Sequence, residues 1–166
     1  TDQKNQIIIL KAINILKKNI NLKLLIYGRG VEKDNLQNYI KQNHLDNIVK
    51  IRPFIDNPYT VLKQSDLFIL SSKYEGLPNV LLEALTLKKF IISSNCPTGP
   101  REILLNGKNG YLFKTDNYLD LSQKILKYQK NKSKLKRISQ IAFKSLDRFD
   151  YQKNLNEYYN FLKKFL

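Results

Sequence analysis

Two carboxylates flank a short loop that leads into an expected helix, and they are the residues best suited to chemistry in this chain. Glu75 opens the run Glu-Gly-Leu-Pro-Asn-Val-Leu-Leu-Glu, and Glu83 closes it. Pro78 suits the first helical position, because its φ is preset and it has no N–H to leave unpaired. Leu77 then stands at the N-cap, and its side chain has no oxygen to offer the helix.

A helix start without a side-chain cap leaves backbone N–H groups open to a ligand. We expect the unpaired groups to be those of Asn79, Val80 and Leu81. Free N–H groups at the positive end of a helix dipole favour a phosphate. A second helix start differs, because Asn57 before Pro58 supplies an ordinary cap. The alternative is that Glu75 or water caps the first helix.

Several other kinds of site have little support. The single cysteine, Cys96, excludes an internal disulfide and is expected to be a small buried packing residue. The single histidine, His44, is expected to be solvated, and it rules out a multi-histidine metal cluster. No Asp-x-Asp pair is present to hold a metal against a diphosphate, so no metal is expected.

The composition is that of a globular domain with a strongly positive charge. The 166 residues are 42% hydrophobic, and the net charge is +15. This charge points to a polyanionic partner: nucleic acid, an anionic membrane surface or a phosphorylated substrate. Only five of the 29 basic residues are Arg, which is weak support for nucleic acid. No run of 18 apolar residues occurs, and a start at Thr1 without any Met suggests a fragment or a processed chain.

Hydrophobic periodicity predicts alternating strands and helices. The expected strands span residues 22–27, 48–52, 67–70, 90–93 and 110–113. The expected helices span residues 3–19, 32–44, 58–64, 78–87, 101–105, 117–130, 133–147 and 151–165. This alternation indicates an α/β fold with a parallel sheet and helices on both faces. Ligands bind at the carboxyl ends of such strands, where three loops are expected to converge: Gly28–Gly30, Lys73–Leu77 and Asn95–Gly99.

Several motifs together resemble the donor-binding domain of family-four retaining glycosyltransferases. Glu75 and Glu83 stand eight positions apart, the Glu-x7-Glu signature of that family. The other matching segments are Lys4-Asn5-Gln6, Gly28-x-Gly30, Cys96–Leu104 and Asn106–Gly110. The resemblance implies a Rossmann-like doubly wound parallel sheet, one half of a GT-B enzyme. Residues 1–166 would form a single nucleotide-sugar-binding domain, with the N-terminal acceptor domain absent.

The same resemblance implies roles for individual residues. Glu75 would face the donor sugar and its anomeric centre, Lys4 would neutralise the diphosphate, and Glu83 would accept hydrogen bonds from the ribose. The remaining donor-binding residues would be Gly76, Leu77, Pro78, Asn79, Val80, Gly28, Gly30, Arg52 and Phe54. Several have an ordinary alternative: Glu75 as a helix-capping acid, Glu83 and Lys4 as surface residues, Gly28 and Gly30 as a tight turn, and Phe54 as core packing.

The pair Arg101 and Glu102 and the C-terminal helix each allow more than one interpretation. Arg101 and Glu102 are taken first as a structural pair. The C-terminal helix carries an apolar stripe made of Tyr151, Leu155, Tyr158, Leu162 and Phe165. In the family this segment runs back toward the N-terminal domain, and the alternative is that it packs on its own domain.

The resemblance implies transfer of a sugar from a nucleoside diphosphate, with UDP as the expected carrier, in synthesis of bacterial surface glycans such as O-antigen, lipopolysaccharide or capsule. The acceptor would be a polysaccharide or a polyprenyl-diphosphate-linked glycan. The protein would be cytoplasmic and peripheral at the anionic inner membrane. The alternatives are a nucleotide-sugar epimerase and a basic nucleic-acid-binding module. The latter is disfavoured because the 18 Tyr and Phe residues mostly fall at core-periodic positions.

Overall fold

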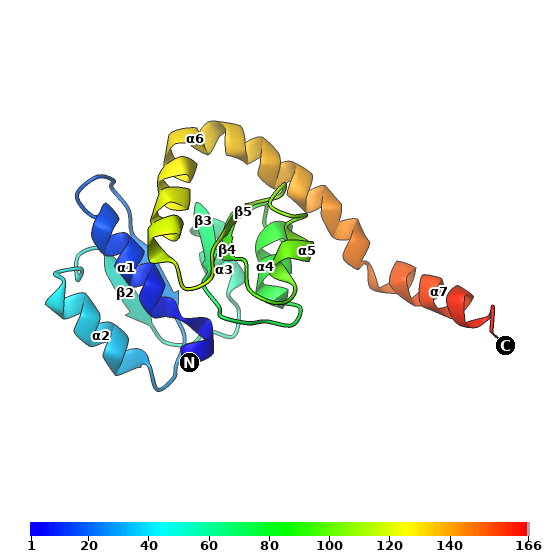
Figure 1. The fold of residues 1–166 in the computed structure, drawn as a ribbon, viewed down its shortest axis with the longest axis horizontal. Helices are drawn as coiled ribbons and strands as arrows, with labels where there is room; N and C mark the ends of the chain where they lie inside the picture. Colours follow the sequence, from blue (N-terminus) through cyan, green and yellow to red (C-terminus); the bar gives the residue numbers. More distant parts are fainter. Residues whose placement is uncertain (166) are drawn as a thin grey trace.

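The computed structural model describes residues 1–165 and has an α/β fold (Figure 1). Leu166, the last residue of the expected domain, lies outside the described residues. The strands are β1 (Leu24–Tyr27), β2 (Val49–Arg52), β3 (Leu67–Leu70), β4 (Phe90–Ser94) and β5 (Tyr111–Phe113). The helices are η1 (Asp2–Lys4), α1 (Gln6–Leu16), α2 (Lys33–Gln42), α3 (Tyr59–Gln64), α4 (Asn79–Thr86), α5 (Pro100–Ile103), α6 (Tyr118–Lys144), η2 (Ser145–Phe149) and α7 (Tyr151–Leu162).

All strand pairs are parallel, as the alternation of strands and helices predicts. β1 pairs with β2, with Leu24 opposite Val49. β3, β4 and β5 form a second sheet in that order. The three loops expected to form a site therefore follow the carboxyl ends of β1, β3 and β4.

Side chains of β4 point alternately into two hydrophobic clusters, one on each face of the three-stranded sheet. Phe90 and Ile92 pack into the cluster built with α1, α2 and the first part of α6. Ile91 packs on the opposite side, with α4, α5 and the end of α6. Helices therefore cover both faces of the three-stranded sheet. The two-stranded sheet is covered on one face in the described residues, since Leu25 and Tyr27 stay exposed.

Two helices differ from the sequence-based expectation. The helix expected over residues 3–19 is interrupted at Asn5, whose φ of 49° separates η1 from α1. This residue is buried, and its side-chain amide donates to Asp116 Oδ1 at 2.6 Å, which holds the break in place. The helices expected over 117–130 and 133–147 join in the single bent α6, with the non-helical residue Asn131 at the bend.

α7 extends away from the rest of the molecule (Figure 1). All its side chains are exposed, including Tyr151, Leu155, Tyr158 and Leu162 of the apolar stripe, and Phe165, which follows the helix, is exposed as well. The alternative that this helix packs on its own domain is therefore wrong. The expectation that most Tyr and Phe residues lie in the core is wrong as well. Among residues 1–165 only Phe90, Phe113 and Tyr128 are buried, because many of the others lie on α7 and on loops.

Candidate functional site

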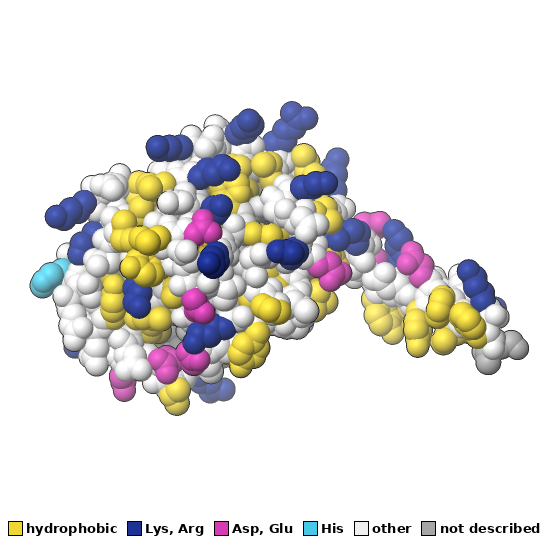
Figure 2. Space-filling model, viewed as in Figure 1, with side chains coloured by type: hydrophobic (Ala, Val, Ile, Leu, Met, Phe, Trp, Pro, Cys, Tyr) yellow, Lys and Arg dark blue, Asp and Glu magenta, His cyan; other side chains and the backbone are white. Residues whose placement is uncertain are grey.

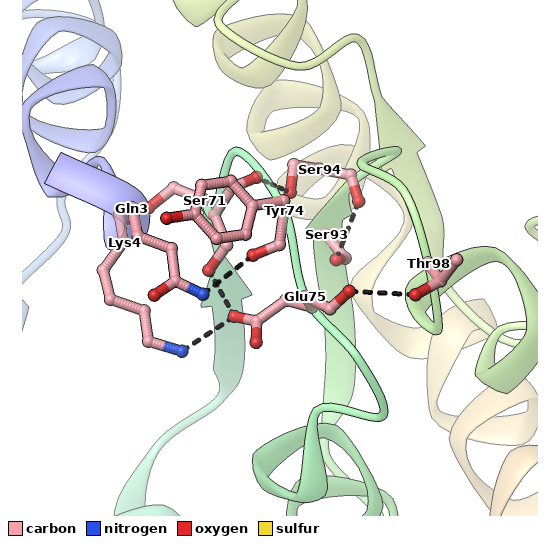
Figure 3. Close-up of polar contacts among 9 residues, drawn as sticks. Gln3, Lys4, Ser71, Tyr74, Glu75, Ser93, Ser94 and Thr98 are labelled. Carbon is pink, nitrogen blue, oxygen red and sulfur yellow. Dashed lines mark hydrogen bonds and ion pairs between the residues drawn. The ribbon is translucent and has the colours of Figure 1, made fainter.

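The loop after β3 and the loop after β4 are joined through the backbone of Glu75. The Glu75 N–H donates to the Pro97 carbonyl at 2.9 Å. Thr98 donates back to the Glu75 carbonyl twice, from its N–H at 3.2 Å and from its hydroxyl at 2.9 Å. These bonds confirm that two of the three expected loops converge (Figure 3).

Gly99 allows this close approach. A Cβ at this position would lie 2.6 Å from Pro78 Cδ and would overlap the Gly76 carbonyl oxygen. The φ of Gly99 is also +83°, a conformation that side chains disfavour. Only glycine therefore lets the loop after β4 lie directly against the start of α4.

The N-terminal segment η1 lies across the loop after β3. Lys73 donates its N–H to the Gln3 carbonyl at 2.9 Å, and the Gln3 amide donates to the Tyr74 carbonyl at 3.0 Å. Lys4 Nζ lies 2.8 Å from Glu75 Oε1 (Figure 3). Two charged residues that stand 71 positions apart are thus in direct contact.

The two side chains of the Lys4–Glu75 pair differ in solvent exposure, and this difference suits a ligand-binding site at the carboxyl end of β3. The Glu75 side chain is 9% exposed, whereas the Lys4 side chain is 43% exposed. The ammonium has three donors, and one of them is used on Glu75. Lys73 forms a more exposed pair with Asp2 at 2.6 Å, and this hydrogen bond raises the pKa of Lys73. The carboxyl end of β3 therefore offers a ligand both the partly free ammonium of Lys4 and the nearly buried carboxylate of Glu75.

The start of α4 differs in detail from the sequence-based expectation. Pro78 is the N-cap rather than the first helical residue, because its ψ of 94° is extended and the helix begins at Asn79. The expectation that Leu81 has an unpaired N–H is wrong, since it donates to the Pro78 carbonyl at 2.9 Å. The alternative in which Glu75 caps the helix is also wrong, because no side chain caps it.

Two donors nevertheless remain open at this helix start. Among residues 1–165, the N–H groups of Asn79 and Val80 have no hydrogen-bond partner. At the start of α3, in contrast, Asn57 Oδ1 accepts the Tyr59 N–H at 3.0 Å. Asn57 does so from the position before the N-cap, which is Pro58, so the expectation that Asn57 is itself the N-cap is wrong. The start of α4 therefore keeps open N–H donors where the start of α3 has a side-chain acceptor, and a phosphate at α4 stays a prediction.

Glu83 lies one turn into α4 and is half-buried. Within residues 1–165 its carboxylate makes no hydrogen bond or ion pair, so its acceptor capacity is unused. Gly76 and Leu77 are exposed in the loop before α4, and half of the Leu77 surface is accessible. Gly76, Leu77 and Glu83 are thus all at least partly accessible to a ligand beside the start of α4.

The loop after β1 forms a second part of the site. A shallow hollow there is lined by Gln6, Tyr27, Gly28, Gly30 and Ile51, among others. The Gly28 N–H donates to the carbonyl of Arg52 at 3.1 Å, and Thr1 lies next to Gly30. Thr1 and Gln6, which both line the hollow, stand on either side of η1 in the sequence, and η1 is the segment that carries Lys4.

Arg52 and Phe54 lie at the end of β2 and in the loop after it, and both are exposed. Phe54 is 56% exposed and packs against the guanidinium of Arg29, whose central carbon lies 5.6 Å from the ring centre. The alternative that Phe54 is a core residue is therefore wrong.

The remaining sequence-based candidates have ordinary roles. Arg101 and Glu102 do not pair with each other; Arg101 donates to Asn95 Oδ1 at 3.1 Å, and both side chains are exposed. Cys96 is buried as expected, and burial raises the pKa of its thiol. His44 is exposed. Residues 1–165 contain no group of three or more potential metal ligands. They also contain no helix with the length and apolar character needed to cross a membrane.

Four polar residues of the site were given no individual role by the sequence. Ser71 Oγ donates to the Lys4 carbonyl at 2.7 Å, and Ser72 Oγ donates to Glu75 Oε1 at 2.5 Å. Ser94 Oγ donates to the Ser72 carbonyl at 2.6 Å. Thr98 is the fourth. The sequence did contain a sign of three of them, because a Ser-Ser pair stands at the carboxyl end of each of two successive strands, Ser71-Ser72 after β3 and Ser93-Ser94 at the end of β4.

Residues 1–145 match the family model described as "Glycosyl transferases group 1". An uncharacterized glycosyltransferase of Methanocaldococcus jannaschii is 43% identical over 105 residues, which are 63% of this chain and 26% of the relative. The N-acetylgalactosamine-N,N'-diacetylbacillosaminyl-diphospho-undecaprenol 4-alpha-N-acetylgalactosaminyltransferase of Campylobacter jejuni is 33% identical over 140 residues, 79% of this chain and 38% of the relative. The chain thus spans less than half the length of these curated relatives.

A solved structure confirms the fold. A TarM mutant of S. aureus, in complex with Fondaparinux, alpha-GlcNAc-glycerol and UDP, superposes with a TM-score of 0.87. The sequence identity is 24%, and the match covers 95% of this chain and 32% of TarM. At this identity the likeness establishes the architecture alone.

Proposed function

Since the chain belongs to the glycosyl transferases group 1 family, we propose that it is the donor-binding domain of a retaining glycosyltransferase and that it holds a UDP-linked sugar. The observation that carries this proposal is the 2.8 Å contact between Lys4 and Glu75 beside the start of α4. A cation, a carboxylate and two open N–H groups at one strand end suit a diphosphate and the sugar attached to it.

Each group has a role in this proposal. The Lys4 ammonium and the N–H groups of Asn79 and Val80 bind the diphosphate, which carries the negative charge of the leaving group. Glu83 accepts hydrogen bonds from the ribose hydroxyls, and Glu75 faces the anomeric centre, where positive charge develops. Gly28, Gly30, Arg52 and Phe54 approach the nucleotide base, and Gly76, Leu77 and Pro78 shape the loop between them. No metal is required for these contacts.

The acceptor is proposed to be a glycan or a polyprenyl-diphosphate-linked glycan. The named activity of the Campylobacter jejuni relative, which acts on a diphospho-undecaprenol glycan, supports this class. We place the enzyme in bacterial surface-glycan synthesis, peripheral at the anionic cytoplasmic face of the inner membrane. The exposed stripe of α7 would contact the N-terminal acceptor domain, which makes up the second half of a GT-B enzyme.

The test is a calorimetric titration with UDP, GDP and ADP, without metal, on wild-type protein and on Glu83→Ala. We expect UDP to bind, and we expect Glu83→Ala to weaken UDP binding by at least about tenfold, because hydrogen bonds to a charged acceptor are lost. Glu157→Ala is the matched control, since it removes the same charge from the exposed helix α7.

Equal loss of affinity in Glu157→Ala would contradict the ribose contact, because a more positive protein should not bind the UDP anion more weakly and the loss would then reflect a general disturbance of the protein. If none of the three nucleotides binds to this chain or to the full-length protein, the proposed function is wrong. Tighter binding of GDP or ADP would keep the donor-domain assignment and change the base.

A further inference from the structure

On the basis of the function proposed above, we propose that Ser72 is a positioning residue that orients the Glu75 carboxylate for the donor sugar. Ser72 is fully buried and is the second residue after β3. Its hydroxyl donates to Glu75 Oε1 at 2.5 Å. Because Ser72 is buried, it would not touch the donor itself and would act through Glu75.

The Glu75 carboxylate is held asymmetrically. Oε1 accepts two hydrogen bonds, one from Ser72 Oγ at 2.5 Å and one from Lys4 Nζ at 2.8 Å. Oε2 has no donor among residues 1–165 and is not a buried unpaired atom. One oxygen is therefore fixed by the protein, while the other stays available to a ligand. Two donors on one oxygen also restrict rotation of the carboxylate about its last bond.

Ser72 is the more rigid of the two donors. The Lys4 side chain is 43% exposed and ends a long flexible chain. Ser72 is 0% exposed, and the Ser94 hydroxyl holds its carbonyl at 2.6 Å. Moreover, when the donor binds, we expect the Lys4 ammonium to move partly from Glu75 Oε1 to the diphosphate. Ser72 would then be the donor that keeps Oε1 in place throughout the reaction.

The experiment uses the full-length protein and a panel of UDP-glucose, UDP-galactose and their N-acetylhexosamine counterparts, with UDP release as the readout. We expect Ser72→Ala to lower kcat by about tenfold to a hundredfold, the effect of one hydrogen bond to a charged group. The Kd for UDP should stay unchanged, because UDP lacks the sugar that Glu75 faces. Ser72→Thr, which keeps a hydroxyl, should restore most of the rate.

A double-mutant cycle separates positioning from folding. In a Glu75→Ala background, Ser72→Ala should cause no further loss of kcat, because the carboxylate that its hydroxyl contacts has been removed. Ser139→Ala is the matched control, since this serine is also buried but donates within α6 to the Leu135 carbonyl. It should leave kcat unchanged. If Ser72→Ala does not fold, Ser72→Cys retains the volume with a weaker donor and should give an intermediate rate.

The outcomes distinguish the two proposals. If UDP binds and donor is turned over, but Ser72→Ala keeps the wild-type kcat or acts additively with Glu75→Ala, the role of Ser72 is refuted while the proposed function stands. Absence of UDP binding, or no turnover of any sugar in the panel, would count against both.

Discussion

Gly99 is the residue at which two loops of the site come closest. Its missing side chain makes room for Pro78 and for the Gly76 carbonyl. We expect Gly99→Ala to lower the free energy of unfolding by about 1–3 kcal/mol, because overpacking and a positive φ both oppose the new Cβ. Denaturant unfolding of the two proteins measures this difference.

The control for this substitution lies in the opposite loop. A Cβ at Gly76 would meet nothing within 4 Å, so Gly76→Ala should change the free energy of unfolding by less than about 0.5 kcal/mol. An equal loss in both variants would show that loop flexibility, and not the close approach, determines stability here.

Among the helices, α6 connects the two halves of the core, and Tyr128 anchors it. Its ring stacks on Phe90 of β4 with centres 5.4 Å apart, and its hydroxyl donates to the Asp66 carbonyl at 2.9 Å. Burial raises the pKa of Tyr128 to about 12. Above pH 10 the unfolded chain therefore loses this proton more readily than the folded protein does, and stability falls as pH rises.

Tyr128→Phe isolates this effect. At neutral pH the variant should be less stable by about 1 kcal/mol, because one hydrogen bond is lost. From about pH 10 to about pH 12 the difference should shrink by about 1–2 kcal/mol, since only the wild type carries the penalty for ionising this phenol. Denaturant unfolding at a series of pH values checks this. A difference that stays constant up to about pH 12 would contradict it.

The whole molecule carries its positive charge broadly over the surface, as Figure 2 shows for one face. Exposed basic residues follow α6, among them Lys130, Lys134, Lys136 and Arg137. We expect the protein to sediment with vesicles that contain phosphatidylglycerol, because each basic residue near an anionic surface contributes about 1 kcal/mol. Binding should disappear near 1 M salt, where the screening length falls to about 3 Å.

Two controls test whether charge causes this binding. Vesicles of phosphatidylcholine alone should not bind the protein, and replacing the four basic residues of α6 by Gln should weaken binding to anionic vesicles. Salt-independent binding to neutral vesicles would instead implicate the apolar side chains of α7, which are visible in yellow at the end of that helix in Figure 2.

The types of the strands and helices, the parallel pairing and the missing side-chain cap at α4 could be determined from the sequence. These features depend on periodicity and on neighbouring residues, which act over a few positions. The helix start expected at Pro78 likewise placed Glu75 in a loop and Glu83 in a helix, as the structure confirms. The break at Asn5 was missed, because a buried contact with the distant Asp116 stabilises it.

Only the tertiary structure decided which side chains meet. The contact of Lys4 with Glu75 spans 71 positions, and it depends on η1 crossing the loop after β3. The hydrogen bond from Ser72 depends on how the Glu75 backbone is held by the loop after β4. The exposure of α7 was equally undetermined, because an amphipathic stripe predicts a partner without showing which surface provides it. Long-range contacts depend on how the backbone packs in three dimensions, and local sequence patterns do not specify that packing.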